Sequence, residues 1–211
     1  MIEAVLWDFG GVLTSSPFEA FNRYEAERGL PRDLIRSINA RDPHTNAWAR
    51  LERSELSPAE FDGAFHAEAL RAGFDVPGSD VLALLAGDLR PEMVAALDAV
   101  IAAGLRTACL TNNIGGGAAE PADARSAAVA DVLARFDVVV ESSKVGIRKP
   151  EPDFYLLACE RLGVQPAACV FLDDLGINLK PAAAMGMRTI KVTDPAGAIA
   201  ELEQVLGIPL R

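Results

Sequence analysis

The sequence predicts an α/β fold in which a doubly wound, mostly parallel sheet carries an inserted all-helical cap. Short apolar runs that end in polar residues recur along the chain, and stretches with helix start and stop signals separate them. A long segment after the first run, residues 15–90, contains no strand-like run and has helical patterning. The expected α/β core therefore comprises residues 1–14 and 91–211, and the expected cap comprises residues 15–90.

Five apolar runs are the expected strands. Runs this short and apolar are typical of strands buried on both faces of a parallel sheet. Ligands of such sheets bind beyond the carboxyl ends of the strands, so the polar residues that end the runs should converge there. The runs are residues 4–7 before Asp8, "LRTACL" before Thr111 and Asn112, "FDVVV" before Glu141, "ACVFL" before Asp173 and Asp174, and "RTIKV" before Thr193.

The helices between the later strands have readable ends. Pro91 stands near the start of one helix, and Gly104 follows the end of "EMVAALDAVIAA". A second helix runs from Pro152 to a stop at Gly163, and a third stops at Gly186. Strands that alternate with helices in this way favour the doubly wound architecture.

The expected cap shows helical periodicity and a clear helix start. Phe18, Phe21 and Tyr24 share one stripe, and "SPAE" forms a capping box with Ser57 as N-cap and Glu60 three residues later. A helical insert placed directly after the first strand is expected to lie over the strand ends as a lid that excludes water. The alternative is a helical appendage that only adds hydrophobic core.

Composition excludes several classes of function. The formal charge is −10, and the sequence pI is about 4.7, so the chain lacks the basic surface that binds nucleic acid or an anionic membrane. No uncharged apolar run reaches the ~20 residues of a membrane span, and no signal peptide is visible at the start. Three separated cysteines in apolar surroundings favour core thiols of a reduced, cytoplasmic protein. A monomer and a homodimer both remain open.

One carboxylate stands at the end of the first apolar run. Asp8 is followed by Gly10 and Gly11, and a carboxylate presented in this way can form an aspartyl-phosphate that water then hydrolyses. A phosphate at this position requires charge neutralisation, for which Mg²⁺ is suited because it accepts both carboxylates and phosphate oxygens. Asp8 and Asp174 can supply the carboxylates, and Gly10 can supply a main-chain oxygen.

Residues at the other strand ends complete a candidate phosphate site. Thr111 and Asn112 offer a hydroxyl, an amide and backbone N–H groups, and Lys149 offers a point charge. Each of these has an ordinary structural explanation when it is taken alone, such as a turn or a helix cap. Their joint placement at strand ends favours a small phosphorylated substrate. Residues 115–128, "GGGAAEPADARSAA", are expected to form a flexible loop beside this site.

Four segments in order resemble the motifs of the haloacid dehalogenase (HAD) superfamily, and the match spans essentially the whole chain. They are "DFGGVL", "LTNN", the lysine within "VGIRKPEPDFY", and "FLDDLGINLKPAAAMGM". The last two most closely resemble the N-terminal phosphatase domains of soluble epoxide hydrolases and a related domain fused to some acyl-CoA dehydrogenases. The resemblance implies a HAD-like, Rossmann-like fold, a helical cap and dependence on Mg²⁺.

The resemblance also implies a role for each matching residue. Asp8 would be the nucleophile and a metal ligand, Gly10 and Asp174 further metal ligands, Thr111 and Asn112 phosphate-binding residues, Lys149 the cation that orients nucleophile and phosphate, Asp173 a partner of the metal ligands, and Asn178 a support for their loop. Lys144 is a rival for the lysine role, but it lacks the proline that follows the lysine of the motif.

Gly10 departs from the pattern of most phosphatases of this superfamily. Most of them carry an aspartate at this position, which protonates the leaving alkoxide; such a general acid is typically worth about 10²–10⁴-fold in rate. Glycine weakens this step without excluding it, and acyl or anomeric phosphates depend on the acid least. Glu52, Asp42 and His44 are candidates from the cap to replace it.

The expected function is that of a Mg²⁺-dependent phosphatase acting on a small phosphorylated metabolite or a lipid phosphate. One alternative is a metal-independent 2-haloacid dehalogenase, in which Asp173 and Asp174 would be uncompensated charges beside the nucleophile. Another is a weakly active or silent HAD protein that binds phosphate ligands, which Gly10 favours.

Overall fold

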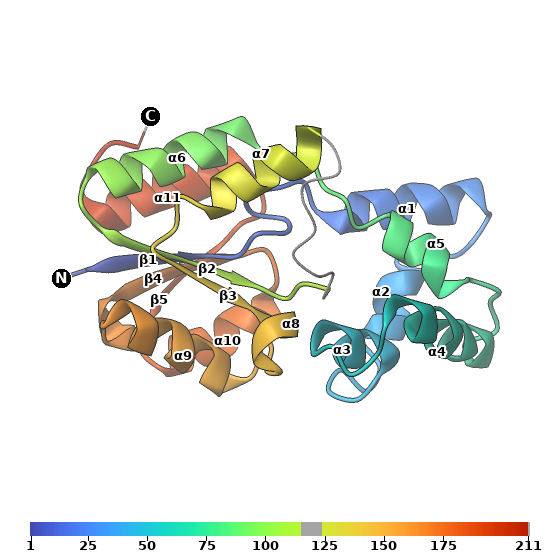
Figure 1. Cartoon of the computed structure of the whole chain (residues 1–211). Coiled ribbons are helices and arrows are strands. Elements are labelled where there is room, and N and C mark those ends of the chain that lie inside the picture. Colours follow the sequence, from blue (N-terminus) through green and yellow to red (C-terminus); the bar gives the residue numbers. More distant parts are fainter. Residues whose placement is uncertain (115–123, 211) are drawn as a thin grey trace.

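The computed structural model describes residues 1–114 and 124–210, whose central feature is a five-stranded sheet in the order β3-β2-β1-β4-β5. All four strand pairings are parallel, and helices cover both faces (Figure 1). The α/β prediction is therefore confirmed. The strands are β1 (Ala4–Trp7), β2 (Arg106–Thr111), β3 (Val138–Glu141), β4 (Cys169–Asp173) and β5 (Arg188–Lys191).

Two helical layers enclose the sheet, one on each side in Figure 1. One layer contains α6 (Pro91–Ala102), α7 (Ala124–Leu133) and α11 (Pro195–Leu206). The other contains α8 (Ser142–Val145), α9 (Pro152–Leu162) and α10 (Gly176–Ala184), and a short 3₁₀ helix, Pro166–Ala168, precedes β4. Pro91 and Pro152 begin their helices as expected. Gly163 ends α9 with φ 68°, a left-handed conformation that glycine adopts without steric cost.

Strand β1 lies at the centre of the sheet and is buried on both faces. Alternate side chains of a strand point to opposite faces. Val5 and Trp7 accordingly join the hydrophobic cluster beneath α6 and α11, whereas Leu6 packs with Phe154 and Phe171 on the other side. Packing against both clusters fixes β1 in place, and it therefore also fixes the position of Asp8, which follows the strand.

A helical insert with its own hydrophobic core follows β1. Its core is a chain of aromatic rings whose neighbouring centroids lie 5.4–6.4 Å apart, formed by Phe18, Phe21, Trp48, Phe61 and Phe65. The helices of the insert are α1 (Pro17–Glu27), α2 (Leu34–Asn39), α3 (Ala47–Glu52), α4 (Pro58–Arg71) and α5 (Gly78–Ala83). The capping box expected before α4 is present.

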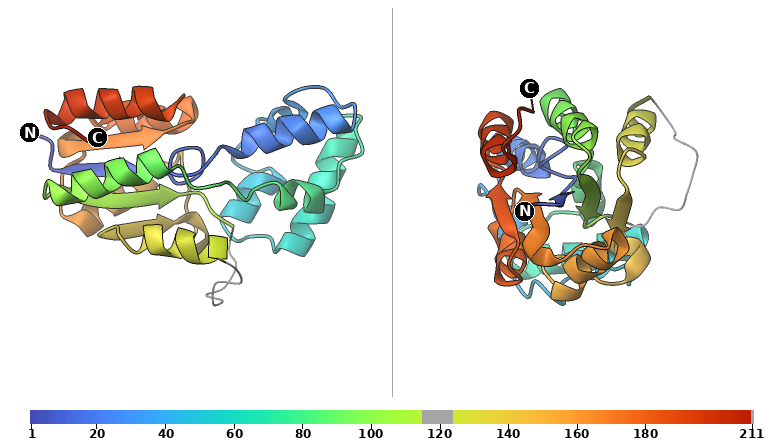
Figure 2. Two further views of the ribbon diagram at one scale, coloured as in Figure 1. Left: turned by 90° about the horizontal axis from the view of Figure 1, so that it is seen from above. Right: turned by 90° about the vertical axis from the view of Figure 1, so that its left-hand side faces the viewer.

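Two adjacent segments join the insert to the sheet. Thr14 and Leu89 form an antiparallel bridge, and the N–H of Ser15 donates to the carbonyl of Asp88 at 2.8 Å. Figure 2 shows the insert beyond the end of the sheet toward which the strands point. We call these paired segments, residues 13–15 and 88–90, the stem.

The expected loop over residues 115–128 is partly wrong. Residues 115–123 lie outside the described part of the chain, but helix α7 already begins at Ala124. The loop is expected because the stretch begins with three glycines and contains a proline, which are typical of loops. The following "ARSAAVADVL" contains four alanines, which are strong helix formers. In the described ranges, no helix is long and apolar enough to cross a membrane.

Candidate active site

Three neighbouring strands bring their ends together at the expected edge of the sheet. Asp8 follows β1, Thr111 ends β2 and Asp173 ends β4, and β1 pairs with both of the other strands. The N–H of Asp8 donates to the carbonyl of Leu172 at 2.8 Å, so the backbone hydrogen bonding continues past β1. The expected convergence of these polar residues is therefore present in the structure.

Lys149 lies between two carboxylates of this edge. Its Nζ is 2.7 Å from Oδ1 of Asp8 and 2.8 Å from Oδ2 of Asp173, and the residue is 1% exposed. Burial lowers the pKa of Lys149, but Asp173 and Asp8 outweigh that effect and hold the pKa above its ordinary value. The side chain is therefore a fixed cation. The rival Lys144 is 73% exposed and pairs with Glu141 instead.

The acids around Lys149 are crowded. Burial raises the pKa of Asp8 well above its ordinary value; Lys149 opposes this rise, and Asp173 and Asp174 add to it. Burial and the neighbouring Asp173 likewise raise the pKa of Asp174 to about 6. Because these carboxylates disfavour one another's negative charge, a cation placed among them would stabilise all of them.

Asp173 and Asp174 differ in the contacts that they make. Both oxygens of the fully buried Asp173 accept hydrogen bonds, from Lys149, from the N–H of Leu175 and from the side-chain amide of Asn178. Asp174 accepts a hydrogen bond from the hydroxyl of Ser16 at 3.3 Å, and its carboxylate makes no other side-chain hydrogen bond to a residue in the described ranges. Asp174 thus keeps oxygen lone pairs for an additional partner, whereas those of Asp173 are engaged within the protein.

These acids fit a hard divalent cation. One oxygen from each of Asp8, Asp173 and Asp174 lies within 4.8 Å of the others. The turn after Asp8 lies against Asp174, because a Cβ added at Gly11 would stand 2.3 Å from Oδ2 of Asp174. Gly11 has φ 78°, so this turn also requires glycine for its backbone conformation. A Cβ at Gly10 would meet nothing within 4 Å.

Asn112 makes a contact that the sequence does not reveal. Its Oδ1 accepts the N–H of Lys149 at 2.9 Å, and its Nδ2 donates to the carbonyl of Lys149 at 3.0 Å. The side chain therefore braces the backbone of the lysine. Thr111 keeps an available hydroxyl, because within residues 1–114 and 124–210 it makes no side-chain hydrogen bond.

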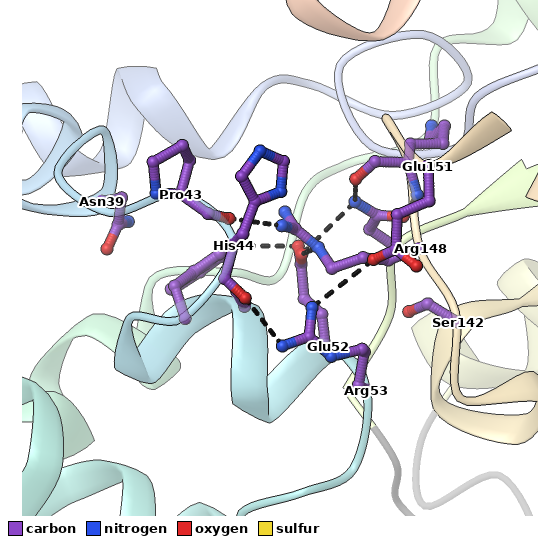
Figure 3. Close-up of polar contacts among 12 residues, drawn as sticks. Asn39, Pro43, His44, Glu52, Arg53, Ser142, Arg148 and Glu151 are labelled. Carbon is purple, nitrogen blue, oxygen red and sulfur yellow. Dashed lines mark hydrogen bonds and ion pairs between the residues drawn. The ribbon is translucent and has the colours of Figure 1, made fainter.

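A buried ion pair beside the site joins the insert to the core. Glu52, at the end of α3, approaches Nε of Arg148 to 2.5 Å (Figure 3). It also accepts hydrogen bonds from Trp48 and Asn112. Burial raises the pKa of Glu52, with Arg148 acting against it. The carboxylate of Glu52 is thus held by one ion pair and two hydrogen bonds at the junction of insert and core. Asp42 and His44 are exposed.

Arg148 is the residue of this pair that sequence reasoning missed. It stands in "RKP", immediately before the lysine of the motif, where a charged residue in a loop ordinarily faces solvent. Its side chain is 11% exposed. The sequence suggests Glu52 only as a proton donor. This buried contact forms because α3 packs against the segment before α9 in the folded chain. Local sequence patterns do not reveal such packing.

The fold and the site define a hydrolase of Rossmann-like architecture with a carboxylate–lysine centre at its strand ends. The chain belongs to the haloacid dehalogenase-like hydrolase family, whose model matches residues 2–186. It is 38% identical over 98% of its length to mouse acyl-CoA dehydrogenase family member 10 and 30% identical over 98% to mouse bifunctional epoxide hydrolase 2. It spans only 19% and 39% of the lengths of these relatives.

Another relative matches along nearly its whole length. Sesquiterpene phosphatase astK of Aspergillus oryzae is 27% identical, with 97% of both chains covered.

Solved structures share the fold. A predicted HAD-like hydrolase from Porphyromonas gingivalis has a TM-score of 0.63 at 20% identity, with 98% of both chains covered. A HAD family enzyme from Bacteroides thetaiotaomicron, in complex with magnesium and inorganic phosphate, has a TM-score of 0.58 at 22% identity. The match covers 90% of this chain and 94% of that one.

Proposed function

We propose that this protein is a Mg²⁺-dependent phosphatase that acts on a small phosphorylated metabolite or a lipid phosphate through an aspartyl-phosphate at Asp8. The observation that carries the proposal is the position of Lys149, whose ammonium group joins Asp8 to Asp173 at 2.7 and 2.8 Å. The full-length similarity to a phosphatase and the magnesium–phosphate complex of a structural neighbour support it. The helical insert would act as the cap of this site.

Asp8, Asp174 and the main-chain oxygen of Gly10 are the groups that would hold Mg²⁺. When bound, the ion supplies positive charge that offsets the charge of the phosphate and of the acids. Asp173 has a different role, because its oxygens already hold Lys149 and the side-chain amide of Asn178. It fixes the lysine and the turn that carries Asp174.

The chain's own residues would divide the reaction as follows. An oxygen of Asp8 attacks phosphorus, the bond from phosphorus to the leaving oxygen breaks, and water later hydrolyses the aspartyl-phosphate. The hydroxyl of Thr111 and the backbone of Asn112 hold phosphate oxygens, while Lys149 offsets the charge that develops on them. Residue 10 offers no proton to the leaving oxygen. Substrates whose leaving group is a weak base, such as acyl or anomeric phosphates, are therefore favoured.

A panel of phosphate esters and acyl phosphates assayed with Mg²⁺ tests this function. Asp8→Asn keeps the shape of the side chain and removes the nucleophile, so turnover should fall at least ~10³-fold. Lys149→Met should also abolish turnover, whereas Lys144→Met, which removes the exposed lysine of the same segment, should leave it unchanged. EDTA should stop the wild-type reaction. Turnover that survives Asp8→Asn contradicts the proposal.

The absence of an acidic side chain at Gly10 favours a second candidate, a protein that binds phosphate ligands with little turnover. Binding of inorganic phosphate with Mg²⁺, without hydrolysis of any member of the panel, would support it. The dehalogenase alternative is disfavoured by the crowding of Asp174 beside Asp8, because a metal-free reaction leaves that charge uncompensated. Halide release from 2-haloacids in EDTA would revive this alternative.

A further inference from the structure

The insert is anchored to the core at Arg148, which contacts the insert at two points. Its Nε approaches Oε2 of Glu52 at the end of α3, and its guanidinium donates to the carbonyl of Pro43 at 2.9 Å, in the loop before α3 (Figure 3). The side chains of Glu52 and Arg148 are 8% and 11% exposed. One core residue thus contacts both the end of α3 and the loop that precedes this helix.

Glu52 extends this contact into the site. Its Oε2 also lies 3.3 Å from Nδ2 of Asn112, and its Oε1 accepts the indole N–H of Trp48 at 2.9 Å. The indole fixes the carboxylate from within α3, so the carboxylate has a defined place between Arg148 and Asn112. Arg148 precedes Lys149 in the chain, and Asn112 is hydrogen-bonded to the backbone of Lys149.

Lys149 receives its position from the same two residues. Asn112 holds both backbone polar groups of Lys149, and Arg148 is its neighbour in the chain. The Nζ of Lys149 then reaches Asp8. A displacement of the Asn112 amide or of the Arg148 backbone therefore moves the ammonium group relative to the nucleophile. The contacts form a continuous path from the insert to Asp8.

We propose that Glu52 and Arg148 form a positioning pair that sets Lys149 against Asp8 when the insert is docked. A buried ion pair is weak evidence for stability, because its desolvation offsets its attraction. The pair instead contacts Asn112, which holds the backbone of Lys149, and through this residue it orients the lysine. The kinetic part of this inference rests on the proposed phosphatase function, whereas the structural part does not.

The chain contains a matched control. Arg53 and Glu151 also pair between insert and core, at 3.4 Å, and the Glu151 side chain is 32% exposed. Within the described residues, the side chain of Glu151 contacts neither Asn112 nor the backbone of Lys149. Glu151→Gln thus removes an ion pair across the same junction without disturbing the brace.

The test compares Glu52→Gln with Glu151→Gln by two measurements. Amide hydrogen exchange at Lys149, followed by NMR, reports on its N–H bond to Asn112 without any substrate. Turnover of p-nitrophenyl phosphate with Mg²⁺ reports on catalysis. Glu52→Gln should speed the exchange of Lys149 and lower kcat on the order of 10²-fold, with a smaller change in KM. Glu151→Gln should change kcat less than about fivefold.

Glu52→Gln leaves Arg148 buried and unpaired and can weaken folding. The double variant Glu52→Gln/Arg148→Met removes both charges and provides a neutral comparison, in which exchange and kcat should stay impaired. Unchanged exchange at Lys149 in a folded variant overturns the inference, and so does faster exchange with wild-type kcat. If wild-type protein hydrolyses no phosphate, the proposed function fails, and the exchange data still decide whether the pair positions Lys149.

Discussion

The α/β core and the helical insert hold their functional side chains by different means. In the core, Asp8, Thr111 and Asp173 stand on or directly after neighbouring hydrogen-bonded strands, so the sheet itself sets their spacing. In the insert, Glu52 reaches the site from a helix packed on an aromatic cluster, and it is held there by an ion pair. The sheet thus fixes the side chains of the core through its backbone, whereas the insert reaches the same edge through a few side-chain contacts.

The largest expected effect is the loss of folding free energy when a large buried side chain is removed from the core of the insert or from that of the sheet. Phe61 of the insert and Phe171 of the sheet are both fully buried, and replacing either with alanine should cost about 3–5 kcal/mol. Because the clusters are separate, Phe61→Ala should raise hydrogen exchange in α1–α5 and leave the strands protected. Phe171→Ala should instead raise exchange throughout the sheet. Uniform loss of protection in Phe61→Ala would show that the two regions unfold as one unit.

The next effect is a change in kcat when an acid is introduced at Gly10, in the turn after Asp8. A Cβ at Gly10 meets nothing within 4 Å, so Gly10→Asp should fold and place a carboxyl group at the site. If this group acts as a general acid, kcat for alkyl phosphates should rise on the order of 10²-fold, about 3 kcal/mol in barrier.

Acyl phosphates are the control for this variant, since their leaving group needs no proton and their rate should change little. Equal gains with both substrate classes, or no gain with alkyl phosphates, would contradict the view that the missing acid limits the reaction.

The smallest effect lies at the start of α4. Ser57 accepts the N–H of Glu60, and the Glu60 carboxylate accepts the N–H of Ser57. Ser57→Ala should destabilise the insert by about 1 kcal/mol. Denaturant unfolding followed by tryptophan fluorescence, in a Trp7→Phe background that leaves Trp48 as the reporter of the insert, measures this change. A matched substitution at the exposed Ala59, such as Ala59→Ser, should be nearly neutral, and equal effects of the two would exclude a capping role.

The sequence predicts the core better than the insert. Strands β1, β2 and β4 are short apolar runs that end at or just before a polar residue of the candidate site, so Asp8, Thr111 and Asp173 are located from local pattern alone. Local pattern offers Lys149 only as a nearby positive charge, and the resemblance to a family is what favours it over Lys144 as the partner of Asp8. The brace from Asn112 and the pair of Glu52 with Arg148 join residues 37 and 96 positions apart in the chain. Such contacts arise from tertiary packing, which periodicity does not encode.

The stem gives the insert a property of its own. Residues 13–15 and 88–90 pair as two short antiparallel segments, so the chain leaves the core and returns to it at almost the same place. Segments inserted between closely spaced ends are exchanged readily in proteins, because the host fold need not stretch to receive them. A different module grafted at this junction would meet the same strand ends with the same spacing. A replacement module would therefore keep the strand-end spacing of Asp8, Thr111 and Asp173, but it would need its own counterpart of Glu52 to contact Arg148 and Asn112.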